Sequence, residues 1–261
     1  MRILFLGDIV GKPGRQAVRT LLPRLVDRAR LDVVVANCEN VTDGSGVDPK
    51  NAGELLEAGV HVLTSGNHVW RRKEIVEFIE RQPRLLRPAN FPPNVPGRGW
   101  TVTESADGTS VAVLNLIGRV FMDSVDCPFQ AAERLVPELQ KRARVILVDM
   151  HAEATSEKGA MGRFLAGKVA AVVGSHTHVQ TADECVLAGG TAFITDAGMC
   201  GPIESILGVR VEPVLRRFLT HMPTKFDVAS GPVIVQGAMI DVDPESGRAS
   251  AIRRVQERVE R

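Results

Sequence analysis

Short apolar runs alternate with longer amphipathic stretches over the first two thirds of the chain. Five of these runs have the length and composition of buried strands, and they span residues 2–6, 32–36, 60–64, 144–149 and 168–173. The stretches between them have the spacing or the end signals of helices, and they span residues 15–30, 48–59, 71–82, 129–142 and 156–165. The first of these helices follows a turn at Gly11–Gly14, and Asp48-Pro49 has the residue types of a helix start. This alternation predicts an α/β fold.

Later segments follow a different pattern, in which pairs of strands flank glycine-containing turns. The turns contain Asp107-Gly108, Gly189-Gly190 and Asp243–Gly247, and we expect an antiparallel hairpin around each. One further helix is predicted near residues 211–219. Alternation followed by hairpins favours mixed sheets over a purely parallel sheet. No repeat or change of composition divides the chain, so residues 1–261 are predicted to form a single domain.

Composition and charge exclude several classes of protein. The 261 residues have ordinary apolar content and a formal net charge of +1, which indicates neither disorder nor the basic field that long nucleic acids attract. No apolar run approaches the roughly 20 residues of a membrane span, and the N-terminus becomes acidic too soon for a signal peptide. The four cysteines are scattered without a Cys-x-x-Cys pair, which predicts free thiols. We therefore expect a cytoplasmic protein.

Polar side chains follow five of the predicted strands at their carboxyl ends. The five segments are Gly7-Asp8, Asn37-Cys38-Glu39-Asn40, Gly66-Asn67-His68, Met150-His151 and Gly174-Ser175-His176-Thr177-His178. A single polar residue at a strand end can be a cap or a turn, but the carboxyl ends of strands in a wound sheet share one edge. Four of the six histidines lie in these segments, whereas His61 and His221 are interpreted as structural. The pattern predicts one site at this edge.

The side chains at this edge predict a site with two metal ions. Imidazole together with carboxylate suits Zn, Mn or Fe better than Ca or Mg. The candidate ligands are too many for one tetrahedral ion, and they are Asp8, Glu39, Asn40, Asn67, His151, His176 and His178. Two ions about 3.5–4 Å apart accommodate this number. In an extended chain the side chains of His176 and His178 would point apart. They would then bind two neighbouring ions, or one would bind a metal ion while the other has a different role. Two divalent ions would attract phosphate.

These motifs resemble those of a known family. Gly66-Asn67-His68 and the His176–His178 turn resemble the GNH and GHxH signatures of calcineurin-like metallophosphoesterases. Nearly the whole chain is similar to the YmdB-like branch, through segments 2–15, 36–40, 151–158 and 195–199. Val10 stands where the wider superfamily has a histidine ligand, Glu39-Asn40 stands where it has a bridging aspartate, and Val69 follows His68 where it has an acidic residue. All three departures are typical of the YmdB-like branch.

The resemblance implies a four-layer α/β/β/α sandwich of two mixed sheets, the calcineurin-like metallophosphoesterase fold. It implies metal 1 on Asp8, Glu39, Asn40 and His178, and metal 2 on Glu39, Asn67, His151 and His176, with Glu39 bridging. The two metals would be Fe or Mn, with Zn as an alternative. His68 would be the catalytic acid, and the alternative is that it supports Asn67. The implied activity is phosphodiester hydrolysis, with 2′,3′-cyclic nucleotides as substrates and a hydroxide between the metals as nucleophile.

The sequence leaves two other functions open. A metal-dependent phosphomonoesterase would use the same core, and a regulatory protein would bind a nucleotide with little turnover. Lys12, Arg15, Arg119 and Lys158 are unranked candidates for contact with phosphate. The expected partner is a small phosphodiester or cyclic nucleotide rather than a membrane or a long nucleic acid. We also expect a homo-oligomer, with the helices beside the Pro-rich segment 88–97 as the candidate interface.

Overall fold

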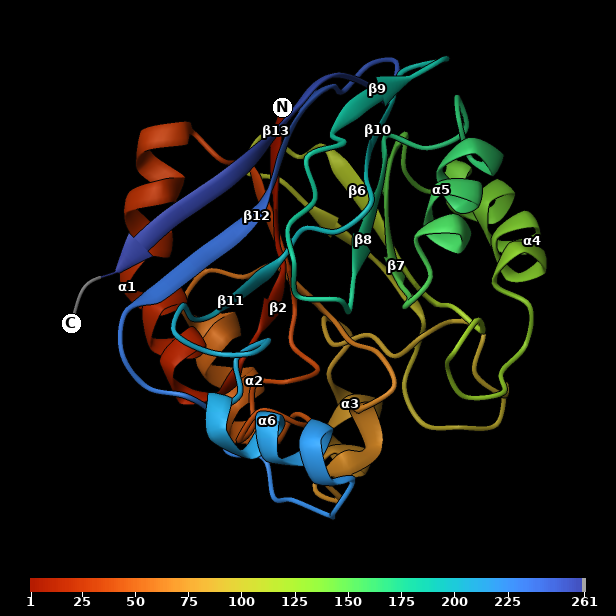
Figure 1. The fold of residues 1–261 in the computed structure, drawn as a ribbon. Helices are drawn as coiled ribbons and strands as arrows, with labels where there is room; N and C mark the ends of the chain where they lie inside the picture. Colours follow the sequence, from red (N-terminus) through yellow and green to blue (C-terminus); the bar gives the residue numbers. More distant parts are fainter. Residues whose placement is uncertain (260–261) are drawn as a thin grey trace.

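The computed structural model describes residues 1–259 as two β-sheets packed face to face, with helices on both outer faces (Figure 1). The helices are α1 (Gly11–Ala29), α2 (Pro49–Glu57), α3 (Ile75–Arg81), α4 (Pro128–Gln140), α5 (Thr155–Phe164) and α6 (Val211–Thr220), with a 3₁₀ turn η1 (Val69–Arg71). In Figure 1, α1 flanks one side of the paired sheets, and α4 and α5 flank the other. Among residues 1–259, none of these helices has the length and apolar character that crossing a membrane requires.

The first sheet has seven strands and the second has six, and both are mixed. The first contains β1 (Arg2–Leu6), β2 (Asp8–Ile9), β3 (Val33–Asn37), β4 (Val62–Thr64), β11 (Met199–Pro202), β12 (Val233–Asp243) and β13 (Arg248–Val259). The second contains β5 (Trp100–Glu104), β6 (Ser110–Ile117), β7 (Val145–His151), β8 (Ala171–Ser175), β9 (Cys185–Leu187) and β10 (Thr191–Ile194).

Strand order explains why the carboxyl ends of several strands meet. In the first sheet the order is β2-β11-β12-β1-β3-β4, with β13 paired to β12, and β1, β3 and β4 are parallel. In the second sheet the order is β5-β6-β7-β8-β10-β9, and the four central strands are parallel. The three predicted hairpins, β5–β6, β9–β10 and β12–β13, are confirmed as antiparallel pairs.

Alternation of apolar side chains along the strands divides the core into three layers. On β1, Ile3 and Phe5 point into the layer between the sheets, whereas Leu4 and Leu6 pack under the helices of the outer layer. The outer clusters join α1, α2 and α3 to the first sheet and α4 and α5 to the second. Because successive side chains point to opposite faces, strands buried on both faces have the near-continuous apolar runs seen in the sequence. The four-layer sandwich implied by the resemblance is confirmed.

The largest differences from the predicted helix boundaries are at the starts of α1 and α3. Gly11–Gly14 is the first turn of α1 rather than a turn before it. Helix α3 begins at Ile75 and not at Arg71, because Arg72 is extended. The Arg72 guanidinium donates to the backbone oxygens of residues 42 and 45, which holds this part of the chain against the neighbouring loop.

The sequence pattern did not predict strands β2 and β11. Their pairing places Met199 opposite Asp8 and Cys200 opposite Ile9. A two-residue strand has no periodicity to detect, and β11 contains Gly201 and Pro202, which are poor strand formers. Asp8 therefore lies within the first sheet rather than in a loop after β1.

Candidate metal centre

The predicted ligands lie together where the carboxyl ends of strands from both sheets meet. Asp8 comes from β2, Glu39 and Asn40 follow β3, and Asn67 follows β4 in the first sheet. The second sheet supplies His151 at the end of β7 and His176 and His178 after β8. The expectation that the edge of one sheet forms the site is therefore wrong, because both sheets contribute. The fold brings all seven predicted ligands into one region.

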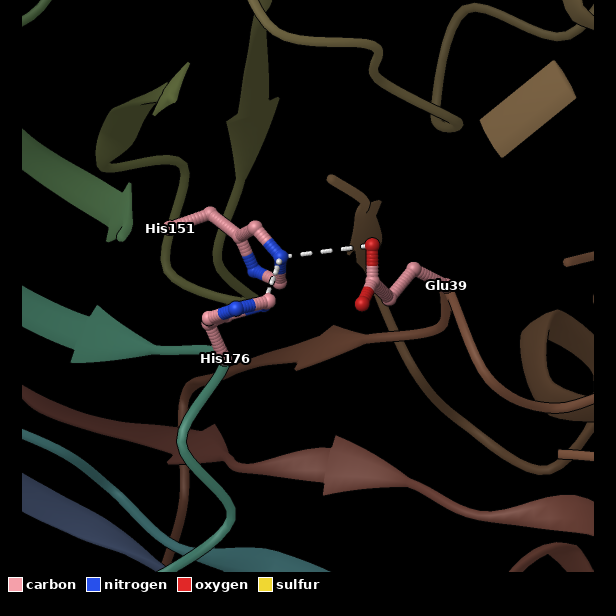
Figure 2. Close-up of side chains that lie close together, drawn as sticks. All are labelled: Glu39, His151 and His176. Carbon is pink, nitrogen blue, oxygen red and sulfur yellow. Dashed lines mark hydrogen bonds and ion pairs between the residues drawn. The ribbon is translucent and has the colours of Figure 1, made fainter. Parts of the chain in front are cut away.

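One half of the site surrounds the Oε2 atom of Glu39. His151 Nε2 lies 3.2 Å from this oxygen and 3.2 Å from Asn67 Oδ1, and His176 Nδ1 lies 3.1 Å from His151 Nε2. Figure 2 shows the two imidazoles and the Glu39 carboxylate pointing toward one another. One ligand atom from each of these three side chains fits within 4.8 Å of the others, which is the spacing of groups that could share a metal ion.

The other half of the site surrounds the buried carboxylate of Asp8. His178 Nε2 lies 3.7 Å from Asp8 Oδ1 and 3.1 Å from the Asn40 amide nitrogen, which in turn lies 3.2 Å from Glu39 Oε1. Asp8 Oδ1 is fully buried and has no hydrogen-bond partner within residues 1–259. A buried carboxylate oxygen without a partner is costly unless a cation pairs with it. The two oxygens of Glu39 thus face two different groups of ligands.

Hydrogen bonds on the outer side of each imidazole fix which ring nitrogen faces the site. Ser175 Oγ donates to Asp149 Oδ1 at 2.6 Å, so at 2.9 Å it accepts from His151 Nδ1–H. His178 Nδ1–H donates to the Leu207 carbonyl at 2.9 Å. His176 Nε2 lies 3.1 Å from a Glu153 oxygen. In the neutral rings these contacts leave His151 Nε2, His176 Nδ1 and His178 Nε2 as the free lone pairs, the arrangement that ligand histidines require.

Backbone conformation allows the ligands to approach so closely. A Cβ atom on Gly66 would lie 2.1 Å from His151 Nε2 and 2.4 Å from Glu39 Oε2, so only glycine fits at this position. His176 and His178 have φ angles of 97° and 63°, in the left-handed region that side chains rarely adopt. The expectation of an extended chain at this turn is therefore wrong, although the two imidazoles do point to different halves of the site. Such backbone strain persists where the surrounding structure enforces it.

A buried ion pair holds this strained turn in place. Lys158 Nζ lies 2.6 Å from Asp196 Oδ2, and both side chains are almost completely buried. The same oxygen accepts hydrogen bonds from the backbone N–H and the hydroxyl of Thr177, at 3.1 and 2.7 Å. Thr177 lies between the two histidines, so the ion pair fixes the segment that carries both.

The pKa values of the proposed ligands are shifted in different directions. Burial raises the pKa of Asp8, although the imidazoles of His178 and His151 act in the opposite direction. Burial alone would raise the pKa of Glu39, but the His151 and His68 imidazoles hold it below its usual range. Burial alone would lower the pKa of His151, but the Glu39 carboxylate raises it to about 9. Burial and the charge of His151 lower the pKa of His176 to about 3. Without a metal, a proton on His151 therefore supplies positive charge to this site.

His68 lies beside the ligands and faces the cavity. Its backbone N–H donates to Glu39 Oε2 at 3.1 Å, and its Nδ1 lies 2.8 Å from Asn40 Oδ1. The side chain is about one quarter exposed. Burial lowers the pKa of His68, against an opposing effect of the Glu39 carboxylate. The contacts of His68 are to Glu39 and Asn40, and no hydrogen bond joins its side chain to Asn67 among the described residues.

The site opens into a cavity of about 430 Å³. Its polar lining includes Glu39, Asn40, His68, His176 and His178. The remaining lining residues are Val10, Asp43, Gly44, Ser45, Glu153, Thr177, Leu207, Val209, Phe226, Asp227 and Val228. No lysine or arginine of residues 1–259 lines this cavity. The basic candidates from the sequence lie elsewhere, since Lys158 pairs with Asp196, Arg15 pairs with Glu54, and Lys12 and Arg119 are exposed.

His61 and His221 have structural positions outside the site. His61 Nδ1 accepts the Val34 N–H at 3.1 Å, and His221 is the left-handed residue that ends α6. All four cysteines are free. Cys38 and Cys200 are buried next to the site, and burial raises the pKa of both thiols, to about 12 for Cys200. They are therefore protonated and unsuited to metal binding in this environment.

Sequence reasoning missed the buried groups behind the ligands. Asp149 accepts hydrogen bonds from Asn37, Thr64 and Ser175, and all four side chains lie between the two sheets. The alternation of side chains along β7 could have predicted the position of Asp149. It points to the same face of the strand as Val145 and Leu147, which lie in the layer between the sheets. No local signal indicates that Glu153 contacts His176, because this contact depends on how two loops approach each other.

Comparisons with known proteins relate the whole chain to one group. A family model described as YmdB-like protein matches residues 4–255. Over 255 residues the chain is 46% identical to the 2′,3′-cyclic-nucleotide 2′-phosphodiesterase of Bacillus subtilis (strain 168), covering 98% of this chain and 96% of that protein. The fold matches the crystal structure of a hypothetical protein from Thermus thermophilus, with a TM-score of 0.92, 41% identity and 99% of both chains covered. It also matches that of a novel phosphatase from Mycoplasma pneumoniae, with a TM-score of 0.93, 32% identity and coverage of 100% of this chain and 94% of that one.

Proposed function

This chain belongs to the YmdB-like protein family, and we propose that it is a metal-dependent phosphodiesterase that hydrolyses 2′,3′-cyclic nucleotides. We take residues 1–261 as one catalytic domain. The similarity to the Bacillus subtilis enzyme supports the substrate class. The structural observation that carries the proposal is the Glu39 carboxylate, whose two oxygens face two separate groups of ligands next to one cavity.

The residues of the site fit two divalent ions. Asp8, Glu39, Asn40 and His178 would hold one ion, and Glu39, Asn67, His151 and His176 would hold the other. Among residues 1–259 Asp8 Oδ1 lacks a hydrogen-bond partner, and the nitrogens His151 Nε2 and His176 Nδ1 lie 3.1 Å apart. One ion in each position would therefore satisfy these three atoms. A ligand set of imidazoles, carboxylates and amides favours Fe or Mn, with Zn as a further candidate.

The ions would supply charge stabilisation for the phosphoryl oxygens and a water molecule of lowered pKa. The protein itself contributes position and proton transfer. A water oxygen forms a bond to phosphorus and gives up a proton to solvent, while the bond from phosphorus to the 2′-oxygen breaks, and the product is a 3′-nucleotide. His68 gives a proton to the departing 2′-oxygen, a contribution typically of about 10²–10⁴-fold. The Nδ1 contact of His68 with Asn40 holds the ring at the cavity wall for this transfer.

The charge of the cavity lining favours diesters over monoesters. A phosphodiester carries one negative charge, whereas a phosphomonoester is close to a dianion at neutral pH. The lining contains Glu153, Asp43 and Asp227 but no lysine or arginine from the described residues. Asp43 and Asp227 pair with Arg72 and Lys225, but Glu153 has neither a lysine nor an arginine partner among the described residues. A dianion would be repelled by Glu153 more strongly than a monoanion, so its binding is less favourable. This observation supports phosphodiester hydrolysis over the phosphomonoesterase alternative.

An assay of the purified, Mn²⁺-loaded protein tests this proposal. We expect a higher kcat/KM for 2′,3′-cyclic AMP than for p-nitrophenyl phosphate, with 3′-AMP as the product. Elemental analysis is expected to give two metal ions per chain. Preference for the monoester would support a phosphomonoesterase, and tight binding of 2′,3′-cyclic AMP without product would support a regulatory nucleotide-binding protein.

We also propose that the chain self-associates, through α6 rather than through the helices beside the Pro-rich segment. Only Val214 of α6 is buried, while Leu215, Phe218 and Leu219 form one exposed apolar stripe. Glu212 and Arg216 lie on the same flank of this stripe, so antiparallel pairing of two α6 helices would bring each glutamate near the arginine of the other copy.

Sedimentation velocity tests this interface. The parent is expected to form a dimer or larger assembly, and Leu219→Glu is expected to dissociate it. Phe121→Glu, at another exposed phenylalanine, should leave the assembly intact. A monomeric parent would contradict the proposal.

A further inference from the structure

The apolar part of the cavity comes mainly from one excursion of the chain. Residues 203–232 leave the first sheet after β11 and return to it at β12, and they include α6. From this excursion Leu207, Val209, Phe226 and Val228 line the cavity, next to the histidines of the metal centre. Phe226 is the only Phe, Tyr or Trp of the described residues that lines it. None of these four side chains has a role in the reaction proposed above.

Hydrogen bonds between its two arms hold this wall in a defined shape. The Arg210 N–H donates to the Asp227 carbonyl at 3.0 Å, and the Ala229 N–H donates to the Gly208 carbonyl at 2.9 Å. Val209 and Val228 pair as an antiparallel bridge. The wall therefore resembles a short two-stranded ribbon with α6 as its connection.

The wall is also tied to the metal centre. The Leu207 carbonyl accepts the His178 Nδ1–H at 2.9 Å, so one hydrogen bond orients a proposed ligand and fixes the wall beside it. Val228 packs against the chain at Gly11 and Gly44, where an added Cβ would lie 2.9 Å from its Cγ2 atom. A substrate whose phosphate lies at the metal centre would therefore meet the apolar wall at a fixed separation.

Phe226 and Leu207 are each close to half exposed, at 48% and 46%. A single exposed apolar side chain needs no explanation, but two in the same catalytic cavity leave an apolar surface available to substrate. A cavity of about 430 Å³ offers more room than a phosphate group needs. Nucleobases stack on aromatic side chains, and this stacking tolerates every base because each has a π-face.

We propose that Phe226, with Leu207, forms a stacking surface for the nucleobase of the substrate. This inference rests on the phosphodiesterase function proposed above. The ligands are nucleoside 2′,3′-cyclic phosphates and the nucleotides formed from them. The acidic groups beside the wall are already paired, Asp43 with Arg72 at 3.1 Å and Asp227 with Lys225 at 3.2 Å. Recognition of the base therefore depends on stacking rather than on hydrogen bonds to its edge. Purine and pyrimidine substrates are both accepted.

A comparison of two substrates in the metal-loaded enzyme tests this proposal. The first is 2′,3′-cyclic AMP, and the second is ribose 2′,3′-cyclic phosphate, which has the same reacting group but no base. Phe226→Ala is expected to lower kcat/KM for the nucleotide by about 5- to 150-fold, the effect of losing one stacking contact. The same variant should leave kcat/KM for the abasic substrate unchanged, and Phe226→Trp should retain activity on both. Phe121→Ala, at an exposed phenylalanine outside the cavity and outside α6, is the matched control and should match the parent.

Two results would overturn the stacking role. In one, Phe226→Ala hydrolyses the nucleotide at the parent rate. In the other, kcat/KM of Phe226→Ala falls equally for both substrates, which indicates a structural effect. If the parent hydrolyses neither substrate, the proposed function fails, and equilibrium dialysis of 3′-AMP and ribose 3-phosphate decides the stacking role separately. Tighter binding of 3′-AMP to the parent than to Phe226→Ala supports it, and equal binding overturns it.

Discussion

Replacement of Ser175 by alanine tests the idea that buried hydrogen bonds prepare the metal ligands. The Ser175 hydroxyl is completely buried between His151 Nδ1, at 2.9 Å, and Asp149 Oδ1, at 2.6 Å. It fixes the His151 ring so that Nε2 faces Glu39. Ser175→Ala removes this hydroxyl without replacing any of the proposed metal ligands. Its effect on metal affinity therefore reports only on how well the His151 ring is positioned.

Two separate costs are expected in this variant. A buried donor or acceptor left without a partner costs about 1–3 kcal/mol, and Asp149 keeps its hydrogen bonds from Thr64 and Asn37 through the other oxygen. The free energy of unfolding of the metal-free protein should therefore fall by about 1–3 kcal/mol. Loss of an outer partner of a ligand histidine typically lowers metal affinity by about 10- to 100-fold, or about 1.4–2.7 kcal/mol.

Urea denaturation with a chelator measures the first cost, and titration calorimetry with Mn²⁺ measures the second. Thr191→Val is a matched control, because the buried Thr191 hydroxyl likewise donates one hydrogen bond, to the Val169 carbonyl, and accepts another, from the Gly167 N–H, but contacts no ligand. Thr191→Val should lose stability while binding metal as tightly as the parent. If Ser175→Ala also binds metal as tightly as the parent, the positioning argument is refuted.

Other consequences of the site can be measured independently. His68→Ala should keep both metal ions but lose about 10²–10⁴-fold in turnover, and an unchanged rate on bis-p-nitrophenyl phosphate would disprove the acid role. Asn67→Ala should empty one of the two metal positions, and elemental analysis that finds two ions would contradict the assignment. In the metal-free protein the pKa of His151 is raised to about 9, so stability from its charged form is complete below about pH 6.5 and should decline as the pH rises toward 9. Bound metal replaces that proton, so chemical denaturation should show this slope only with chelator present. Lys158→Met should destabilise the protein by about 3–5 kcal/mol because it leaves the Asp196 carboxylate buried without its cation, and denaturation at parent-like urea concentrations would argue against this.

Local patterns in the sequence determined most of the architecture and the identity of the ligands. Strands buried on both faces appear as continuous apolar runs, so β1, β3, β4 and β7 could be located from composition and spacing. Each of these strands ends in a polar segment, and ligand chemistry alone indicated a site for two ions. The catalytic role of His68 and the division of ligands between two ions came from the resemblance and stand as proposals.

Packing between the two sheets decided what local patterns could not. Asn37 and Asp149 touch although 112 residues separate them, and His178 reaches Asn40 across 138 residues. Such contacts depend on the relative position of two separately formed sheets, and no spacing along the chain encodes that position. The same applies to the left-handed turn at His176 and His178, which Lys158 and Asp196 hold in place. The sequence thus determined which groups are available for chemistry, whereas the tertiary structure decided which of their atoms face one another, because that choice is made by contacts between distant segments.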